Sequence, residues 1–151
     1  MTTARAYIHW TANGAVHRAT LADGGGTFNV KGAPVKPSTG FAVGIASGDG
    51  VTITGVRADA VPDYLYHFAA LAERYPEADA FGTWHRPDGA IVLDPVMIVR
   101  SIDVAIRLAR ANRQEAIYSF ASGETVDVPP ARHAGGQRVT GSFVSKAGTR
   151  P

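Results

Sequence analysis

The sequence predicts an α+β domain in which short antiparallel β-hairpins form a sheet with two helices packed on one face, followed by a disordered C-terminal tail. Three observations lead to this class: short runs of alternating β-branched and polar residues lie between turn signals, two segments repeat apolar residues at helical spacing, and the end of the chain is polar and contains several glycines. We expect one α+β domain over residues 1–128, with a potential subdivision near residues 57–60. A basic tail follows over residues 129–151.

The composition is that of an ordinary folded domain. The chain has 151 residues, of which 45% are hydrophobic and 19% are charged, and this length suits a single domain with its own core. There is no cysteine, which excludes disulfides, thiolate zinc sites and cysteine nucleophiles. The sequence has neither a secretory-signal pattern nor an apolar run long enough to span a membrane. We therefore expect a cytoplasmic protein without a membrane partner.

The net charge of +2 conceals an asymmetry along the chain. All thirteen Asp and Glu residues precede residue 129, together with eleven of the fifteen Lys and Arg residues, so the body is slightly acidic. The other four basic residues lie in the tail, at Arg132, Arg138, Lys146 and Arg150. The high pI is therefore a property of the tail, and the composition does not favour a basic nucleic-acid face on the domain.

Two hairpins are predicted in the first half of the chain. In residues 7–21, the dipeptide Asn13-Gly14 suits the centre of a type I′ turn, because both residue types tolerate positive φ. Residues 41–46 and 51–56 form a second candidate around the turn Ser47-Gly48-Asp49-Gly50.

The second half is expected to alternate helices and strands. A helix over residues 62–75 begins at Pro62 and ends before Pro76, with an apolar stripe formed by Val61, Leu65, Phe68, Ala72 and Tyr75. Residues 80–85 and 90–93 form a third hairpin around Arg86-Pro87-Asp88-Gly89, and residues 96–99 form another strand.

Another helix and two strands complete the predicted domain. Ser101 is a good N-cap for a helix ending near Arg113, with a core face formed by Val104, Ala105, Leu108, Ala109 and Ala111. Strands over residues 116–120 and 124–128 precede Pro129-Pro130, which ends the sheet. Beyond this point only residues 139–144 could form a further strand, and the rest has too few large apolar groups to offset the entropy of ordering.

Motifs that carry chemistry are weak in this sequence. The best local cluster of potential acid–base or divalent-metal groups is His85, Asp88 and Asp94 around the third hairpin. The simpler interpretation is that Asp88 makes the turn and Asp94 ends a strand before Pro95. We predict no metal site and no cofactor, and the sequence assigns no catalytic residue.

Two surfaces are candidates for binding. Arg107, Arg110 and Arg113 form a basic stripe on the second helix, which could contact phosphates but is more typical of a solvated helix face. Tyr66 and Trp84 alternate away from apolar neighbours and are expected to be exposed, and Trp84 is followed by His85 and Arg86. An exposed aromatic beside an arginine suits a protein-binding surface.

Part of the second half has a familiar composition. The segments are Arg74-Tyr75-Pro76, Phe81-Gly82-Thr83-Trp84, the "LDPV"-containing run 91–96 and the Ala/Arg-rich run 105–118. Residues 74–128, about a third of the chain, resemble small uncharacterised proteins of actinobacteria and their phages, which share these features. The resemblance implies no particular activity.

We therefore expect a non-enzymatic binding or accessory protein of phage or prophage origin that contacts a protein partner through its sheet and the hairpin at residues 82–90. One alternative is a small enzyme or ligand-binding domain that uses His85, Asp88 and Asp94. Another is a nucleic-acid accessory protein that uses Arg107, Arg110, Arg113 and the tail. The sequence is also compatible with a homo-oligomer.

Overall fold

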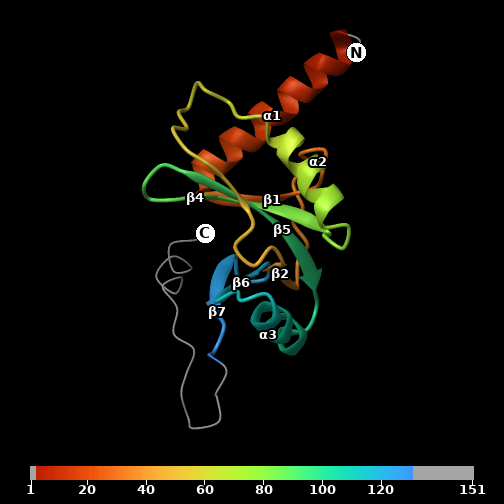
Figure 1. The fold of residues 1–151 in the computed structure, drawn as a ribbon, viewed down its shortest axis with the longest axis vertical. Coiled ribbons are helices and arrows are strands. Elements are labelled where there is room, and N and C mark those ends of the chain that lie inside the picture. Colours follow the sequence, from red (N-terminus) through yellow and green to blue (C-terminus); the bar gives the residue numbers. More distant parts are fainter. Residues whose placement is uncertain (1–2, 131–151) are drawn as a thin grey trace.

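The computed structural model describes residues 3–130, with side chains from Trp10 onward, and has the α+β class predicted from the sequence (Figure 1). Within these residues the helices are α1 (Thr3–Asp23), α2 (Tyr64–Arg74) and α3 (Ile102–Ala111). The strands are β1 (Gly25–Phe28), β2 (Phe41–Gly44), β3 (Val51–Ile53), β4 (Ala80–His85), β5 (Ile91–Val99), β6 (Ala116–Ser119) and β7 (Glu124–Asp127). Apart from Pro129 and Pro130, the predicted tail lies outside the described residues.

The strands form one curled antiparallel sheet with the order β1-β4-β5-β2-β6-β7, and β3 also pairs with β5. Two predicted hairpins are confirmed, β4–β5 and β6–β7. The β4–β5 turn has the expected chemistry, since Gly89 adopts a φ of 90° and its amide donates to the Arg86 carbonyl at 2.9 Å.

The hairpin predicted for residues 41–46 and 51–56 is wrong. Strands β2 and β3 do not pair with each other; they follow one another along the same edge of β5, opposite residues 96–99 and 91–93 respectively. Residues 45–50 bulge out between them, beside Pro95. Because proline has no N–H to donate, the sheet can interrupt its ladder here, and the Pro95 carbonyl still accepts from the Ile45 amide at 3.1 Å.

This pairing also corrects the interpretation of Asp94 as a strand terminator. Strand β5 runs without a break through Asp94 and Pro95, and β4 pairs with it as far as Val96. Residues 96–99 are therefore the end of the same strand rather than a separate one.

The N-terminal hairpin predicted for residues 7–21 is also wrong, because this segment is the helix α1. Its described buried side chains, Asn13, Val16, His17 and Thr20, recur at intervals of three and four residues. Three of these four are polar, so apolar periodicity does not reveal the helix.

Polar contacts to distant segments hold α1 in place. The Asn13 side chain accepts from the Leu65 amide at 3.0 Å and donates to the Asp63 carboxylate at 3.1 Å, so it caps the start of α2 from another helix. The hydroxyls of Thr20 and Thr83 lie 2.7 Å apart and connect α1 to β4. Tertiary partners thus satisfy a buried face that an isolated helix would leave in water.

Helix α2 occupies the predicted segment, but its buried face is shifted. Asp63 is the N-cap, and its carboxylate accepts from the Tyr66 amide at 3.0 Å. The fully buried side chains are Tyr64, Phe68 and Leu71, whereas Val61 is exposed. Tyr64 is not part of the predicted stripe, and its hydroxyl is paired with His17 inside the core.

Helix α3 begins at the predicted cap, where the Ser101 hydroxyl accepts from the Val104 amide at 3.3 Å. Ala105 and Ala109 are buried as predicted, and Leu108 packs partly buried beside them. Val104 and Ala111 are exposed instead, so the core face of α3 is narrower than predicted.

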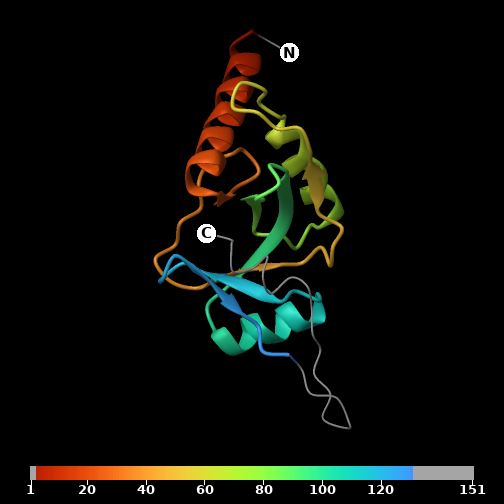
Figure 2. The same ribbon diagram turned by 90° about the vertical axis from the view of Figure 1, so that its left-hand side faces the viewer.

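Two hydrophobic cores lie at opposite ends of the molecule, and β5 connects them (Figure 2). Ile91 and Leu93 at the start of β5 pack with α1 and α2, whereas Val99 at its end packs with α3. Alternate residues of a strand point to one face, so all three described helices cover the same face of the curled sheet. Among the described helices, none is long and apolar enough to cross a membrane.

Candidate functional site

A groove of about 360 Å³ lies along the sheet, largely on the face opposite the helices. Its floor is the small apolar cluster around Ala42 and Val96, with Val35, Tyr118 and Phe120 packed against it. At one end the groove is lined by β1 and by the end of α1, and at the other by β6 and β7. The curl of the sheet therefore brings its first and last strands to two sides of one hollow.

A loop after β1 forms part of one wall. The Asn29 carboxamide oxygen accepts from the amides of Lys31 and Ala33 at 2.9 and 3.0 Å, which turns the chain back. The Val35 amide then donates to the Thr27 carbonyl at 2.8 Å and places Val35 against the groove. A segment that looks like an unstructured loop in the sequence is thus shaped by local hydrogen bonds.

Two glycines leave the β1 side of the groove without side chains. A Cβ at Gly25 would collide with the Thr83 carbonyl, and one at Gly26 would lie 2.9 Å from the Phe28 ring. Gly25 is therefore required for the close approach of β1 to β4, whereas a side chain at position 26 would require the Phe28 ring to move. The result is a stretch of wall that presents backbone rather than side chains.

The lining is chemically suited to binding rather than to proton transfer. Apolar side chains, small residues and strand backbone predominate, and Asp23 and Lys36 are the only acidic and basic side chains among the described lining residues. Acid–base catalysis uses convergent titratable groups in a pocket. A wall of apolar side chains and strand backbone instead suits an extended, partly apolar ligand.

The predicted aromatic surface does not form. Trp84 is buried, with 2% of its surface exposed, because its β4 position faces inward beside Val92. Tyr66 is 65% exposed, as predicted, but lies on α2, on the other face of the sheet from Trp84. The expectation that both aromatics are exposed is therefore wrong for Trp84.

The cluster of His85, Asp88 and Asp94 does not converge. His85 pairs with Ile91, whereas Asp94 pairs with Gly82, so an odd number of positions separates them and their side chains point to opposite faces. Asp88 lies in the turn, where it accepts from Arg86 at 2.7 Å and from the Ala90 amide at 3.1 Å. No group of three or more His, Asp or Glu residues is placed to hold a metal ion within residues 3–130.

The basic stripe on α3 is divided by the structure. The Arg110 guanidinium donates twice to the Pro129 carbonyl, at 2.7 and 3.0 Å, and so anchors the segment after β7. Arg107 is exposed on the helix, while Arg113 lies beyond its end with a φ of 57°. The three arginines therefore do not present a common helix face.

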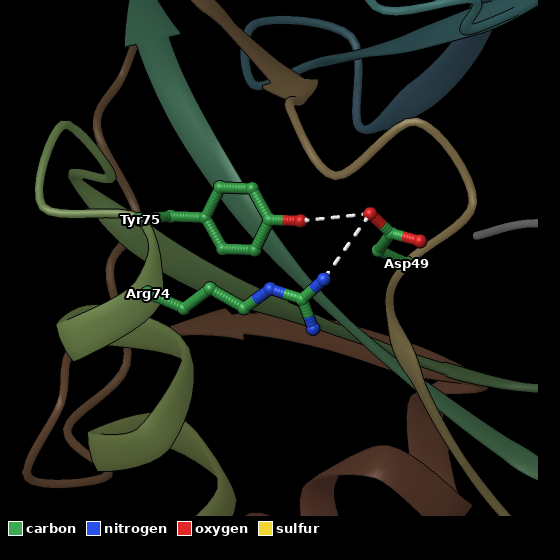
Figure 3. A network of polar contacts seen from close by, with 3 residues as sticks. All are labelled: Asp49, Arg74 and Tyr75. Carbon is green, nitrogen blue, oxygen red and sulfur yellow. Dashed lines mark hydrogen bonds and ion pairs between the residues drawn. The ribbon is translucent and has the colours of Figure 1, made fainter.

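A second polar cluster joins the bulge at residues 45–50 to the end of α2 (Figure 3). One carboxylate oxygen of Asp49 lies 3.4 Å from both the Arg74 guanidinium and the Tyr75 hydroxyl. Desolvation raises the pKa of Tyr75 above its usual value, with a further rise from Asp49 and an opposing effect of Arg74, so the phenol stays protonated and donates. Because Asp49 and Arg74 are both largely exposed, this cluster is a weak surface contact that connects the bulge at residues 45–50 to the end of α2.

The groove was missed in the sequence because its walls come from separate stretches of the chain, between residues 19 and 44, 82 and 96, and 116 and 125. The available signal was the cluster of glycines and prolines over residues 24–40, which the sequence alone cannot distinguish from an ordinary loop.

Comparison with protein-family models, curated proteins and solved structures gives no match to this chain. The resemblance of residues 74–128 to small proteins of actinobacteria and their phages therefore stays a prediction. The function has to be inferred from the geometry of the groove.

Proposed function

We propose that this protein is a non-enzymatic binding protein whose groove takes up an extended, partly apolar segment of a partner polypeptide. The observation that carries the proposal is the lining of the groove, which combines apolar side chains such as Val35, Val96 and Phe120 with strand backbone. A polypeptide in an extended conformation offers both complements, since alternate side chains fill apolar pockets and its main chain pairs with strand edges.

The position of the groove supports the same conclusion. Both terminal strands of the sheet, β1 and β7, contribute to its walls, and edge strands have backbone groups that the sheet itself leaves unpaired. The loop after β1 uses the Thr27 carbonyl through Val35, which leaves β7 as the less covered of these two edges. A partner strand could add there and extend its side chains over the floor.

The proposal can be tested with labelled peptides about ten residues long, with alternating apolar and polar residues, in fluorescence anisotropy titrations. The groove variant is Val35→Trp, which places a large ring in the groove. The matched control is Val30→Trp in the same loop, because Val30 is 41% exposed and does not line the groove.

We expect Val35→Trp to abolish binding and Val30→Trp to leave it unchanged, with both variants giving the circular dichroism spectrum of the parent. Amide chemical-shift changes on peptide addition should centre on Thr27, Val35 and Tyr118. Binding that is unaffected by Val35→Trp, or no binding to any peptide of the panel, would contradict the proposal.

A further inference from the structure

We propose that residues 139–144 of the same chain dock in the groove as an intramolecular strand, which a partner segment has to displace. This inference rests on the proposed function, since it names a competitor for the same groove. Residues 139–144 lie beyond the described residues, and the tail that contains them continues from Pro130.

The tail is long enough to reach the groove. Strand β7, which contributes Thr125 to the groove, ends at Asp127, and the tail begins at Pro129. From Pro130 to Val139 the chain can span up to about 30 Å. The full path across the sheet from β7 to β1 crosses five strand spacings, which is about 24 Å, and the curl makes the direct path shorter. Residues 139–144 can therefore reach any part of the groove.

The side-chain pattern of residues 139–144 matches the floor of the groove. In an extended chain Val139, Gly141 and Phe143 share one face, so two apolar side chains flank a gap. The described floor offers apolar surface from Ala42 and Val96 with the larger Val35 and Phe120 beside it. Residues 139–144 are also the one part of the tail that the sequence predicts to form a strand.

The charge of the tail is opposite to that of acidic side chains near the groove. The basic residues of the tail bracket this segment, with Arg132 and Arg138 before it and Lys146 and Arg150 after it, and the tail has no acidic residue. Among the described residues, Asp23 lines the groove beside β1, and the exposed Asp127 on β7 lies on the same face of its strand as Thr125, which lines the other end. Lys36 is the opposing charge on the wall. The arrangement favours a basic segment with an apolar centre.

A tethered segment of this kind acts as a weak competitor. Attachment to β7 gives it a high effective concentration at the groove without requiring tight contacts. A partner with more apolar residues can then displace it, and the groove is covered when no partner is present.

The full-length chain allows a direct test, because it contains no cysteine. The variant Ser145→Cys carries a single nitroxide label beside the proposed strand, and paramagnetic broadening is measured on the backbone amides of the isotope-labelled protein. We expect loss of amide intensity at Thr27, Val35 and Tyr118, and none at Thr52 or Ser101. The loss should disappear when Phe143→Ser is added, and should decrease as salt is raised.

Three outcomes separate the alternatives. Broadening that spares the groove overturns the intramolecular proposal. In a second experiment, isotope-labelled protein without a spin label is mixed with protein without isotope labels that carries the nitroxide. Broadening of the isotope-labelled amides would show that the tail docks in the groove of a second copy, and would overturn the intramolecular proposal. If Phe143→Ser, without the spin label, binds the peptides no more tightly than the parent, the competition is absent. In each case the proposed function still stands if peptide binding depends on Val35. If the tail does not dock and the peptides do not bind, both the intramolecular proposal and the proposed function are contradicted.

Discussion

The imidazole Nδ1 of His17 lies 2.8 Å from the hydroxyl of Tyr64, and both side chains are buried between α1 and α2. The other ring nitrogen, Nε2, lies 2.9 Å from the Arg57 carbonyl, which can only accept. Nε2 therefore donates to this carbonyl, and in the neutral imidazole Nδ1 then accepts from Tyr64. Burial raises the pKa of the Tyr64 phenol, so it remains a donor. This relay joins the first helix, the second helix and the segment between β3 and α2.

Removing the hydroxyl of Tyr64 should show how much its hydrogen bond to His17 contributes to the free energy of unfolding. Tyr64→Phe keeps the ring in the core but leaves the buried Nδ1 of His17 without its donor, so we expect a loss of about 1–3 kcal/mol in the free energy of unfolding. The control is Tyr66→Phe on the exposed side of the same helix, which should change stability by less than about 0.5 kcal/mol. Urea denaturation measures both, and equal effects would mean that the relay does not contribute.

The raised pKa of Tyr64 predicts an alkaline loss of stability. Above the ordinary tyrosine pKa of 10.0 the unfolded chain releases this proton while the folded protein retains it. The contribution is thus fully present below pH 10 and decreases as the pH rises above it, by about 1.4 kcal/mol per pH unit for one proton. The stability difference between the parent and Tyr64→Phe should therefore shrink above pH 10 in parallel urea titrations. A difference independent of pH would show that Tyr64 ionises in the folded state as it does in the unfolded chain.

A substitution at Gly14 tests whether this segment is a helix or a turn, because the sign of the stability change differs between the two. In a helix, Gly14→Ala should raise the free energy of unfolding by about 0.5–1 kcal/mol, because glycine is a poor residue in a helix interior. The added methyl group would lie 3.2 Å from a guanidinium nitrogen of Arg18, whose exposed side chain can move. At the centre of a type I′ turn the same change would be destabilising, since that position needs positive φ. Thermal and urea unfolding, with far-ultraviolet circular dichroism, distinguish the two.

The bulge between β2 and β3 stores backbone strain that can be measured. Gly48 has a φ of 93°, and a Cβ there would contact nothing within 4 Å, so Gly48→Ala reports on the backbone alone. We expect a cost of about 1–2 kcal/mol. Ser47 has a φ of 49°, so Ser47→Gly should be neutral or stabilising by up to about 1 kcal/mol. Opposite signs in these neighbours are the expected result, and a destabilising Ser47→Gly would argue against the positive φ.

Local chemistry made several elements predictable from the sequence. The β4–β5 and β6–β7 hairpins depend on short turns with glycine at positive φ, and α3 depends on its Ser101 cap. These features involve residues within a few positions of one another, so the local residue types determine their stability. The α+β class followed from the same signals.

Contacts between distant segments decided the rest. The buried face of α1 is mainly polar, and it is stabilised only because Tyr64, Asp63 and Thr83 satisfy it from elsewhere in the chain. Strands β2 and β3 both pair with β5, on either side of Pro95, and no pattern within residues 41–56 reveals this pairing. The groove exists only once the sheet has curled and brought β1, β6 and β7 around one hollow. Burial and pairing act on residues that meet in space, so the sequence determined the local elements and the tertiary structure determined the face on which a partner could bind.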